Sequence, residues 1–551
     1  MQNTLFYGDN LDILRHPSYI PDESVDLIYL DPPFNSNASY NVLFSEKDGS
    51  QAASQIKAFD DTWHWHMAAE QFDETVRAGG PVSQALLAFQ QLLGTNDMLA
   101  YLTMMAPRLV ALRKKLKPTG SLYLHCDPTA SHYLKILLDA AFGPKYFQSE
   151  ITWRRTSSHG DARRRYPDNT DIILFYTKGD KYPFNVQRVP YTQSYIDTFY
   201  VHEDPDGRRW QRGDLTSPHA RPNLTYEYKG WQPPQNGWRI TKENMERLDA
   251  EGRLHFPADP SGRIRLKRYL DEQPGMAVTC SWDDIPPIHS LTAERLGYPT
   301  QKPEALLERI ILTSSNEGDV VLDPFCGCGT TIAAAQNLGR KWVGIDVTHI
   351  AITLMKARLV KAFGEDLDYR VVGEPTSVFD AEALGKQDPH QFQLWALGLV
   401  HARPLEVKKG ADKGIDGRIP FNDGMVKGKD HWTSAIISVK SGHVHSPFIR
   451  DLVGTVQRED AAIGVLITLK EPTKDMLNEA ASAGFYVPPY DETKKYPRIQ
   501  ILTIKQLLEE GKQIDCAPLH YTGVSYKAAP KAEKATGQLG HDFGGVDEGG
   551  E

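Results

Sequence analysis

The chain has 551 residues, which is too many for one hydrophobic core, so two to four domains are expected. Its composition, 40% hydrophobic and 24% charged, is that of an ordinary globular protein, and no apolar run is long enough to span a membrane. The formal net charge of −9 argues against indiscriminate binding to nucleic acid, although a local basic groove stays open. Five cysteines, with no secretory signal at the N-terminus, favour a reduced, cytoplasmic setting.

The first 178 residues alternate between predicted strands and helices. The apolar segment 25–30 predicts a strand that must end at Asp31, because the two prolines that follow cannot extend a sheet ladder. The apolar spacing over 96–116 predicts a helix. This alternation indicates a parallel, doubly wound sheet. Further strands are expected at 4–7, 121–126 and 172–176, and further helices at 10–14 and 130–142.

The alternation stops between residues 179 and 290. This stretch is rich in Pro, Gly, Trp, Tyr and charged residues, which is typical of an inserted module. Alternation returns over 291–375, and a last alternating block covers 388–513. The region 365–385 is interpreted as a linker, and the Gly-, Ala- and Lys-rich tail 527–551 is expected to be disordered. The elements expected after the module are helices at 305–313, 331–338, 392–399 and 448–456 and strands at 320–322, 342–345, 417–419, 435–439 and 463–468.

Residues 320–331 (Val-Val-Leu-Asp-Pro-Phe-Cys-Gly-Cys-Gly-Thr-Thr) predict a strand, a glycine-containing turn and the start of a helix. The glycines allow the backbone to approach a ligand closely, and the N–H groups at the helix start suit a carboxylate or phosphate. The pattern is neither a P-loop nor the Gly-x-Gly-x-x-Gly dinucleotide motif. The next strand ends in Asp346, where an acidic residue can bind ribose hydroxyls. A ligand with a ribose and a small anionic group fits this pattern, and S-adenosylmethionine has both.

Four segments in a consistent order resemble one family. Residues 322–330 resemble motif I of amino-methylating DNA methyltransferases, and 31–34 (Asp-Pro-Pro-Phe) resemble motif IV. Residues 298–304 resemble motif X, and 8–13 resemble the opening segment that helps to line the cofactor's adenine. Because the catalytic motif precedes the cofactor motif, residues 1–375 resemble the permuted β group of adenine-N6 and cytosine-N4 methyltransferases.

This resemblance implies a domain organisation. We expect a Rossmann-like, doubly wound α/β methyltransferase sheet whose catalytic half is 1–178 and whose cofactor-binding half is 291–375. The segment 179–290 between the halves is then an inserted target-recognition module. An α/β domain resembling restriction endonucleases is expected at 388–513.

The resemblance also implies roles for single residues. Asp323 and the two glycines after it would bind the methionine end of S-adenosylmethionine, Asp346 the ribose and Asp9 the adenine. Lys302 is assigned to the cofactor's carboxylate. Relatives often have Glu in place of Asp346, but a shorter acid still reaches a ribose. The implied cofactor-binding set is Asp9, Lys302, Asp323, Phe325, Gly327, Gly329, Thr330 and Asp346.

The chemistry expected at motif IV follows from its residue types. The exocyclic amine of adenine is a poor nucleophile, and acceptors for both of its N–H groups would localise its lone pair. Asp31 can accept one hydrogen bond and the carbonyl of Pro32 the other, while Pro33 stiffens the loop. Phe34 offers a stacking face for a base flipped out of the duplex. This transfer needs no metal in the methyltransferase site. Trp63, Trp65 and His125 are weaker candidates for the pocket, and packing is the favoured interpretation of all three.

Basic residues suggest where DNA is bound. A group of five arginines is interleaved with aromatic residues, which suits a phosphate backbone and unstacked bases. Taken alone, however, the stretch favours a solvated charged loop. The inserted segment is also rich in cations that can contact guanine edges or phosphates. The five arginines are Arg154, Arg155, Arg163, Arg164 and Arg165, and the cations of the insert are Arg208, Arg209, Arg212, Lys229, Arg263, Arg265, Lys267 and Arg268.

The C-terminal block carries a second possible site. Asp416 and Lys440 are both expected at strand ends, where a carboxylate and a lysine can surround a divalent metal that activates water. The pattern resembles the Mrr-like branch of restriction-endonuclease-fold nucleases. Ser438 stands where Glu or Gln is usual, and Gln393 where an acid is common. An Mg²⁺-dependent nuclease, a DNA-binding relic and an unrelated structure therefore all stay open.

We expect a site-specific methyltransferase that moves a methyl group from S-adenosylmethionine to adenine N6 in double-stranded DNA. DNA cleavage as a second activity, in restriction–modification, stays open. Cytosine-N4 methylation is the nearest alternative. Asp31 favours adenine, because cytosine enzymes more often carry Ser at the first position of the motif. A non-catalytic DNA-binding protein regulated by S-adenosylmethionine is the alternative of another class. No membrane partner is expected, and a homodimer stays open.

Overall fold

The computed structural model describes most of the chain, in two compact units. One unit contains residues 1–185 and 280–551, and the other is Val186–Thr279. No helix within the described residues is long and apolar enough to cross a membrane. The residues described are 1–33, 39–42, 56–60, 65–156, 166, 168–259, 262–288, 292, 294–296, 298, 301–400, 402–404, 414–426, 429–488 and 493–516.

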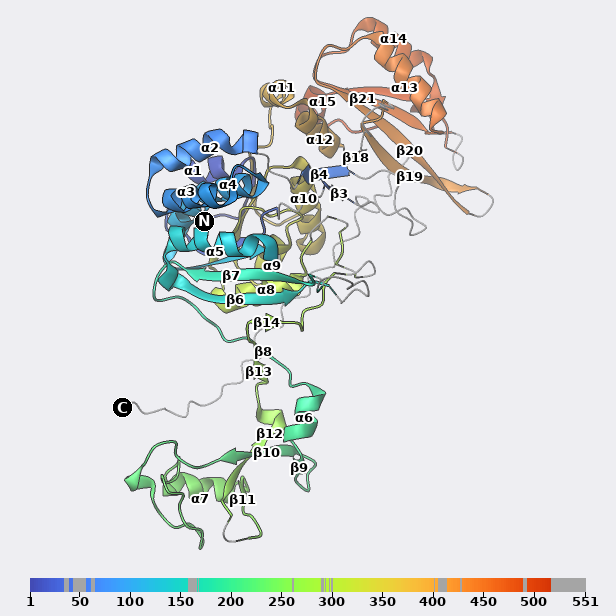
Figure 1. Ribbon diagram of the computed structural model, residues 1–551. Helices are drawn as coiled ribbons and strands as arrows, with labels where there is room; N and C mark the ends of the chain where they lie inside the picture. The colour runs from blue at the N-terminus through green and yellow to red at the C-terminus, as the bar shows by residue number, and fades with distance from the viewer. Residues whose placement is uncertain are drawn as a thin grey trace. The chain divides into compact units, whose positions relative to one another are not determined.

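A nine-stranded sheet in the order β14-β6-β7-β5-β2-β15-β16-β1-β17 organises the first unit (Figure 1). All neighbours run parallel except β7, which is antiparallel to both β5 and β6. A parallel sheet was predicted, but the observed sheet is mixed. The prediction lacked β6, and β6 and β7 follow each other along the chain and pair as an antiparallel hairpin. The strands are β1 (Thr4–Tyr7), β2 (Val25–Leu30), β5 (Leu116–Cys126), β6 (Phe147–Arg154), β7 (Thr170–Thr177), β14 (Ser281–Trp282), β15 (Val320–Asp323), β16 (Lys341–Asp346) and β17 (Arg370–Val372).

Helices cover both faces of this sheet. The main core cluster joins one face to apolar residues of α1 to α5, such as Leu102 and Leu134. On the opposite face, the hydroxyl of Tyr123 in β5 hydrogen-bonds Ser314 of α8 at 2.7 Å. Local capping fixes the helix starts: Asn96 and Asp127 each accept a backbone N–H from the first turn. The helices are α1 (Asn10–Arg15), α2 (Trp65–Ala78), α3 (Pro81–Leu93), α4 (Asp97–Lys115), α5 (Pro128–Phe142), α8 (Glu304–Ser314), α9 (Thr330–Asn337) and α10 (His349–Phe363), with the 3-10 turn η1 (Pro144–Tyr146) and a separate hairpin β3 (Ser39–Val42) and β4 (Ile56–Asp60).

The region 365–385, expected as a linker, is structured. Its strand β17 pairs in parallel with β1, with Thr4 opposite Arg370. Its helix α11 (Val378–Gln387) begins after Ser377, whose side chain accepts the N–H of Asp380. The linker interpretation is therefore wrong, because a three-residue strand is too short to show a period in sequence and is held by its neighbour in the sheet.

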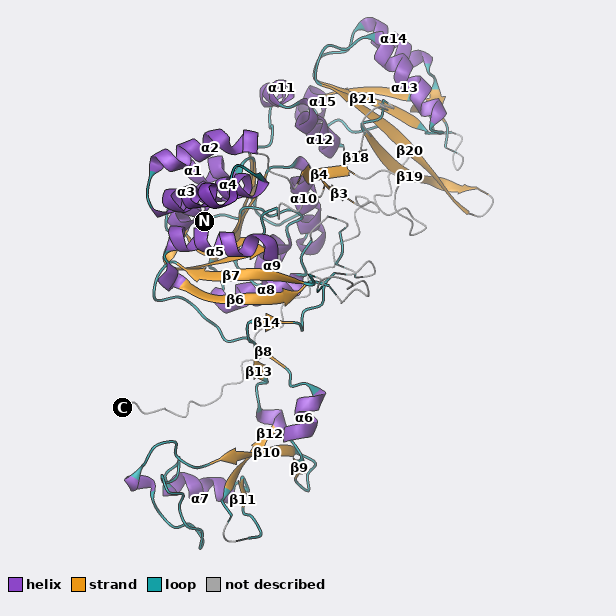
Figure 2. Cartoon of the chain, in the orientation of Figure 1, coloured by secondary structure: helices purple, strands orange, loops and turns teal. Residues whose placement is uncertain are grey.

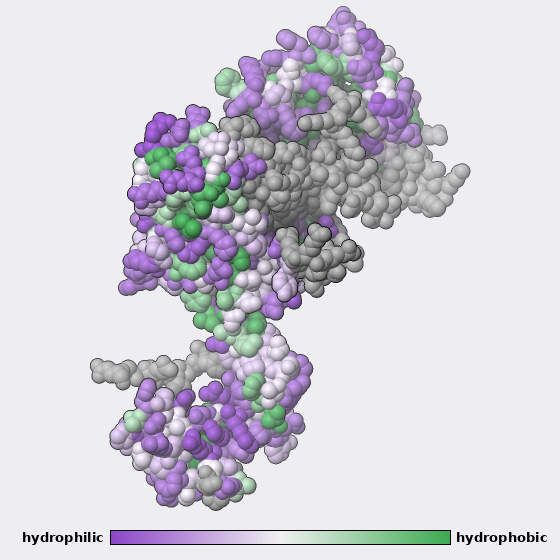
Figure 3. Space-filling view, in the orientation of Figure 1, coloured by the Kyte–Doolittle hydropathy of each residue, from purple (hydrophilic) through white to green (hydrophobic). Residues whose placement is uncertain are grey.

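The second unit, called the module here, is Val186–Thr279 and is narrower than the predicted 179–290. Its four-stranded sheet has the order β11-β12-β10-β9, and its core includes Trp238, Met245 and Leu254. Hydrophilic residues cover most of the module's face that is in view in Figure 3. Its elements are β8 (Arg188–Val189), α6 (Gln193–Phe199), β9 (His202–Glu203), β10 (Arg209–Asp214), η2 (Pro222–Leu224), α7 (Lys242–Ala250), β11 (Leu254–His255), β12 (Arg265–Tyr269), η3 (Leu270–Glu272) and β13 (Met276–Ala277).

The C-terminal domain is built on a five-stranded sheet, β18-β19-β20-β21-β24. Core residues of α12, such as Trp395, pack on one face, and residues of α13 and α14, such as Leu452 and Met476, pack on the other (Figure 2). The expected disordered tail lies outside the described residues. The elements are α12 (Pro389–Leu399), β18 (Arg403–Pro404), β19 (Gly417–Val426), β20 (Lys429–Lys440), α13 (Ser446–Arg458), β21 (Ile463–Thr468), α14 (Lys474–Ser482), β22 (Phe485–Tyr486), β23 (Tyr496–Pro497), β24 (Ile499–Thr503) and α15 (Ile504–Glu509).

Candidate active site

A cavity of about 290 Å³ lies at the edge of the nine-stranded sheet where β2, β15 and β16 end. These strands are parallel neighbours, so their carboxyl ends meet at one edge, as is usual for ligand sites in open α/β sheets. The cavity brings together every predicted catalytic and cofactor residue except Phe34, which lies outside the described residues, and Gly329. The predicted residues that line it are Asp9, Asp31, Pro32, Pro33, Lys302, Asp323, Phe325, Gly327, Thr330 and Asp346.

The loop after β15 is held open by glycines and by one acid. Gly327 and Gly329 have φ values of +47° and +74°, which other residues rarely adopt. A Cβ at position 329 would lie 2.6 Å from Cγ of Met355, so this glycine shapes the loop without lining the cavity. Asp346 accepts hydrogen bonds from the N–H of Gly327 and the N–H of Thr348, each at 2.9 Å. The acid at the end of β16 therefore fixes the loop at the end of β15.

Of the carboxyl groups that line the cavity, Asp323 is buried and Asp346 is partly buried. Burial raises the pKa of Asp323 to about 7, although the N–H of Phe325 donates to its carboxylate at 3.0 Å. Burial also raises the pKa of Asp346 to about 6. Each acid is thus poised to become ionised when a positive charge arrives.

Lys302 forms an ion pair with Asp31. Its Nζ lies 2.7 Å from both carboxylate oxygens, and the two side chains are only 8% and 16% exposed. The resemblance had assigned Lys302 to the cofactor's carboxylate, whereas its partner in this structure is the predicted catalytic acid. This ion pair fixes the position of Asp31 at the end of β2.

Asp9 caps α1 and binds an arginine. One oxygen of its carboxylate accepts the N–H of Leu11 at 2.7 Å. Both oxygens also accept from Nη2 of Arg108, at 2.9 and 2.8 Å. The neighbouring Asn10 donates its side-chain amide to the carbonyl of Pro324 at 2.7 Å. The opening segment is thereby attached to the glycine loop.

Of the predicted DNA-contacting arginines, two are described. Arg154 donates to the carbonyl of Asp283 at 3.0 Å, and Nε of Arg155 lies 3.3 Å from Asp171. The predicted residues outside the described part of the chain are Arg163, Arg164, Arg165 and Trp63. Trp65, expected in a loop, is half-buried at the start of α2 and packs against the main core.

In the C-terminal domain, Asp416 is the centre of a polar cluster. Its carboxylate accepts from Nε2 of Gln393 at 2.8 Å, from Oγ of Ser438 at 3.1 Å and from the N–H of Val439 at 2.6 Å. Nζ of Lys440 lies 3.8 Å away. The structure therefore brings together all the residues singled out in this domain. No group of three or more His, Cys, Asp or Glu that could hold a metal occurs within the described residues.

Comparison with known proteins identifies the family. The DNA methylase model matches residues 25–356, which is more than half of the chain. The chain belongs to the DNA methylase family. The methylase match includes Asp31, Lys302, Asp323 and Asp346, and it begins after Asp9. A second family model, described as restriction endonuclease, matches residues 384–507, the part of the chain that contains Asp416.

Three relatives of this chain are a Type II methyltransferase, a subunit of a Type III restriction–modification enzyme and a DNA adenine methyltransferase. The Type II methyltransferase M.EcaI of Enterobacter cloacae is 35% identical over 359 residues, which are 65% of this chain and 69% of that protein. The Mod subunit of the Type III enzyme StyLTI of Salmonella typhimurium is 27% identical over 68% of this chain and 55% of its own length. A DNA adenine methyltransferase of Escherichia coli K12 is 27% identical over 65% of this chain and 82% of its own length.

Two solved structures are also similar to this DNA methylase. M1.HpyAVI in complex with SAM is 16% identical, covers 65% of this chain and 100% of its own, and has a TM-score of 0.30. The cytosine-N4-specific PvuII DNA methyltransferase is 14% identical, covers 65% of this chain and 86% of its own, and has a TM-score of 0.31.

The DNA methylase also contains a buried polar chain, of which sequence reasoning had named only His125. The hydroxyl of Tyr29 lies 2.8 Å from Nδ1 of His125, and Nε2 of His125 lies 3.0 Å from Asp171. All three residues are at most 2% exposed, and Tyr29 lines the cavity. Although burial opposes it, the hydrogen bond from His125, helped by the charges of Lys302 and Arg155, holds the pKa of Asp171 below its usual value.

Two signals in the sequence indicate that His125 and Arg108 need buried partners. His125 interrupts an otherwise apolar buried strand, and Arg108 interrupts the apolar helix α4. A charged or polar residue at such a position must be satisfied by a partner, because burying it alone is costly. The sequence does not reveal the partner, since Asp9 and Arg108 are distant along the chain.

Proposed function

We propose that this DNA methylase transfers a methyl group from S-adenosylmethionine to N6 of adenine in duplex DNA. The observation that carries the proposal is the single cavity in which Asp31 and Pro32 lie beside the loop around Asp323 and Gly327. A methyl donor held at the loop and an amine held at Asp31 would share one enclosed space. The relative that is a DNA adenine methyltransferase supports adenine as the base.

The residues of the cavity fit S-adenosylmethionine. Its amino group and sulfonium centre are cationic. The carboxyl groups of Asp323 and Asp346, with pKa values raised to about 7 and about 6, would be stabilised as anions by such charges. Asp323 and the glycine loop would hold the methionine end, Asp346 the ribose and Asp9 the adenine. Lys302 stays the proposed partner of the cofactor's carboxylate. When bound, the cofactor supplies an electrophilic methyl group.

The residues of motif IV would prepare the amine. The target adenine must leave the duplex, at a cost of a few kcal/mol, before its amine can reach Asp31. The carboxylate of Asp31 and the carbonyl of Pro32 would accept its two N–H groups and localise the nitrogen lone pair. The nitrogen would form its bond to the methyl carbon as the bond between that carbon and the sulfonium sulfur breaks, which leaves a neutral thioether. Asp31 would accept the proton that the nitrogen loses. Phe34 is proposed as the stacking face.

Two alternatives are separated by one experiment. Cytosine-N4 methylation suits the same acceptors, and a non-catalytic protein regulated by S-adenosylmethionine would use the same cofactor residues. Genomic DNA incubated with the protein and methyl-labelled cofactor is digested to nucleosides. We expect label in N6-methyladenine. Label in N4-methylcytosine would replace adenine by cytosine in the proposal, and no label would overturn methyl transfer.

The role of Asp31 is tested by Asp31→Ala. We expect the rate of methyl transfer to fall by about 100-fold or more, because a charge-stabilising acceptor is lost, while cofactor binding measured by calorimetry changes little. Asp26→Asn is the matched control. Asp26 lies on β2, the strand that Asp31 follows, but it does not line the cavity and accepts a hydrogen bond from Lys117 at 2.8 Å. Full activity of Asp31→Ala would contradict the mechanism.

We further propose roles for the two other parts of the chain. The module would select the DNA sequence, with Arg154 and Arg155 contacting DNA beside the cavity. The C-terminal domain would cleave DNA with Mg²⁺ held at Asp416. The cluster of Gln393, Ser438 and Lys440 around Asp416 supports this second activity.

A further inference from the structure

The module contains fourteen lysines and arginines. Sequence reasoning singled out eight of them without telling them apart, and the structure separates these eight. Five are ion-paired with carboxylates, and three have no ion-pair partner within the described residues. Of these three, Arg212 is exposed in the middle of strand β10. The paired cations are Arg208, Arg209, Lys229, Arg265 and Lys267, and those without an ion-pair partner are Arg212, Arg263 and Arg268.

Arg212 lies on one defined face of the module's sheet. Trp210 and Arg212 in β10 point to the same side, and they stand opposite Tyr269 and Lys267 in β12. The other side of the sheet belongs to the hydrophobic core, through residues such as Leu254. We name the first side the His–Trp face; it consists of His202, Trp210, Arg212, Asp214, His255, Arg265, Lys267 and Tyr269.

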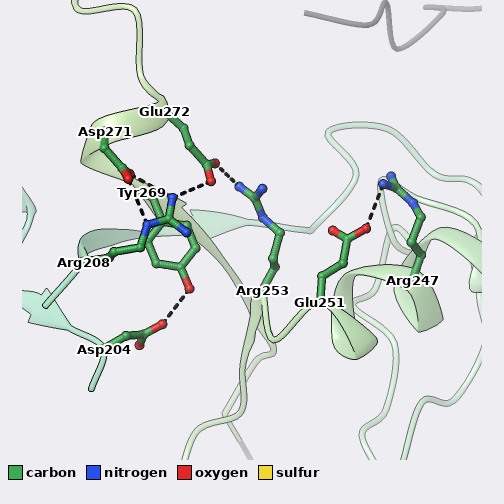
Figure 4. Close-up of polar contacts among 8 residues, drawn as sticks. All are labelled: Asp204, Arg208, Arg247, Glu251, Arg253, Tyr269, Asp271 and Glu272. Carbon is green, nitrogen blue, oxygen red and sulfur yellow. Dashed lines mark hydrogen bonds and ion pairs between the residues drawn. The ribbon is translucent and has the colours of Figure 1, made fainter. Parts of the chain in front are cut away.

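Most charges beside the His–Trp face are internally balanced. Asp204 contacts Lys267 at 2.8 Å and the hydroxyl of Tyr269 at 2.6 Å. Figure 4 shows how Arg208, stacked 3.9 Å from the ring of Tyr269, is held by Asp271 and Glu272, and how Glu272 also binds a second arginine. These ion pairs build the frame of the face. Among the cations of the face, Arg212 is the one with no ion-pair partner within the described residues.

Two imidazoles flank Arg212. His202 stacks on Trp210 with ring centroids 4.4 Å apart, and His255 lies 5.2 Å from the same ring. Burial and the charge of Arg212 lower the pKa of both histidines. Without an anion nearby, the neutral form of both imidazoles is therefore favoured. A nearby phosphate would reverse this preference, because an anion favours the protonated imidazole.

We propose that the His–Trp face is the surface of the module that contacts the DNA duplex, with Arg212 as the direct contact and His202 and His255 as proton-linked contacts. The inference rests on the proposed function. An unpaired guanidinium surrounded by aromatic and imidazole rings suits phosphates and the edges of guanine bases. The neighbouring ion pairs hold the rings in place before DNA arrives.

A salt series tests the contact made by Arg212. Binding of a fluorescein-labelled, random-sequence duplex is measured by anisotropy for wild type and Arg212→Gln between about 50 and about 200 mM salt. We expect the slope of log affinity against log salt to fall by about 0.9 in the variant, so that the wild type loses roughly threefold more affinity over this range. Arg212→Lys, which keeps the charge, should restore the slope.

Arg247→Gln is the matched control. Arg247 is also an exposed arginine of the module, but it is paired with Glu251 on α7 at 3.2 Å, away from the His–Trp face (Figure 4). Its variant should keep the wild-type slope. Equal slopes for wild type and Arg212→Gln would overturn the inference. If labelled methyl still enters DNA in that case, the proposed function stands while the inference fails; if wild type transfers no methyl group, the proposed function fails by itself.

A pH series tests the two histidines. The groups that face them are Arg212, Lys267 and Asp204, together with each other, and the ion pair of Arg265 with Asp214 stands opposite His255. Because binding to phosphate would draw protons onto the imidazoles, the affinity of wild type should rise as the pH falls from about 8 to about 5.5, around the ordinary histidine pKa of about 6.5. The double variant His202→Gln, His255→Gln should lose most of this rise. An unchanged pH dependence would overturn the role of the histidines.

Discussion

Asp323 has surroundings that change its acid–base behaviour. Its side chain is 2% exposed, and burial raises its pKa to about 7. Near neutral pH, the protein without ligand therefore contains both neutral and ionised Asp323. A cationic amino group prefers the ionised form, so ligand binding and pH should be linked at this residue.

We predict that Asp323→Asn changes the pH dependence of stability. The pKa of Asp323 in the folded protein lies above the ordinary value of 3.8, so its contribution to stability is complete below about pH 4 and is lost as the pH rises through about 7. Between about pH 5 and about pH 8, the Tm of wild type without ligand should fall relative to that of Asp323→Asn. S-adenosylmethionine should raise the wild-type Tm more at the higher pH. Parallel curves for the two proteins would contradict the raised pKa.

At the scale of elements, Tyr29, His125 and Asp171 join three neighbouring strands beside the cavity. Backbone pairing places β2, β5 and β7 next to one another, and the polar chain then fixes one aromatic ring at the cavity wall. Replacing buried polar chains by apolar residues of similar volume is often neutral or stabilising, so their presence beside a site suggests a role in positioning.

We predict that Tyr29→Phe and Tyr123→Phe separate stability from activity. Both tyrosines are buried in the same sheet and hydrogen-bonded, Tyr29 to His125 and Tyr123 to Ser314. Each variant leaves a buried partner unsatisfied and should lose about 1–3 kcal/mol of unfolding free energy, measured with urea. Only Tyr29→Phe should also lower the rate of methyl transfer, because Tyr29 lines the cavity. Equal rates in the two variants would contradict a positioning role.

The sequence predicted elements well where an apolar period extends over many residues or where prolines mark the end of a strand. The helix expected at 96–116 is α4 (Asp97–Lys115), and the strand expected to stop at Asp31 ends at Leu30. The helices α2 and α3 were not predicted, and β17 was taken for a linker. The cavity residues were found by motif, but the pairing of Lys302 with Asp31 was not, because a contact between distant segments leaves no local pattern.

At the scale of the whole molecule, one chain combines a methylase part and a part that matches a restriction endonuclease model. Such a combination would let one protein mark DNA and cut DNA that lacks the mark. The methyl group must then change what the second part can do. The position of the two parts relative to the DNA would decide whether a given duplex is methylated or cleaved first.

We predict that Lys440→Ala slows cleavage strongly and leaves methyl transfer unchanged. Lys440 lies 3.8 Å from Asp416, where a lysine can stabilise the charge that develops during hydrolysis. Unmodified plasmid incubated with Mg²⁺ should be nicked by wild type about 100-fold faster than by the variant. Lys505→Ala, an exposed lysine of α15 in the same domain, is the control and should cut like wild type. Equal nicking by wild type and Lys440→Ala would contradict the assignment.

The pairing of β1 with β17 bears on the order of motifs along the chain. These strands are parallel neighbours at one edge of the sheet, with Thr4 opposite Arg370. The start of β1 and the end of β17 are therefore separated by about the length of a three-residue strand, roughly 10 Å. A short bridge could join them, and the chain could be reopened ahead of the glycine loop without cutting a strand. A circular permutant of this kind would place the cofactor motif first and keep the same sheet, so the two motif orders correspond to two places at which one ring of elements is opened.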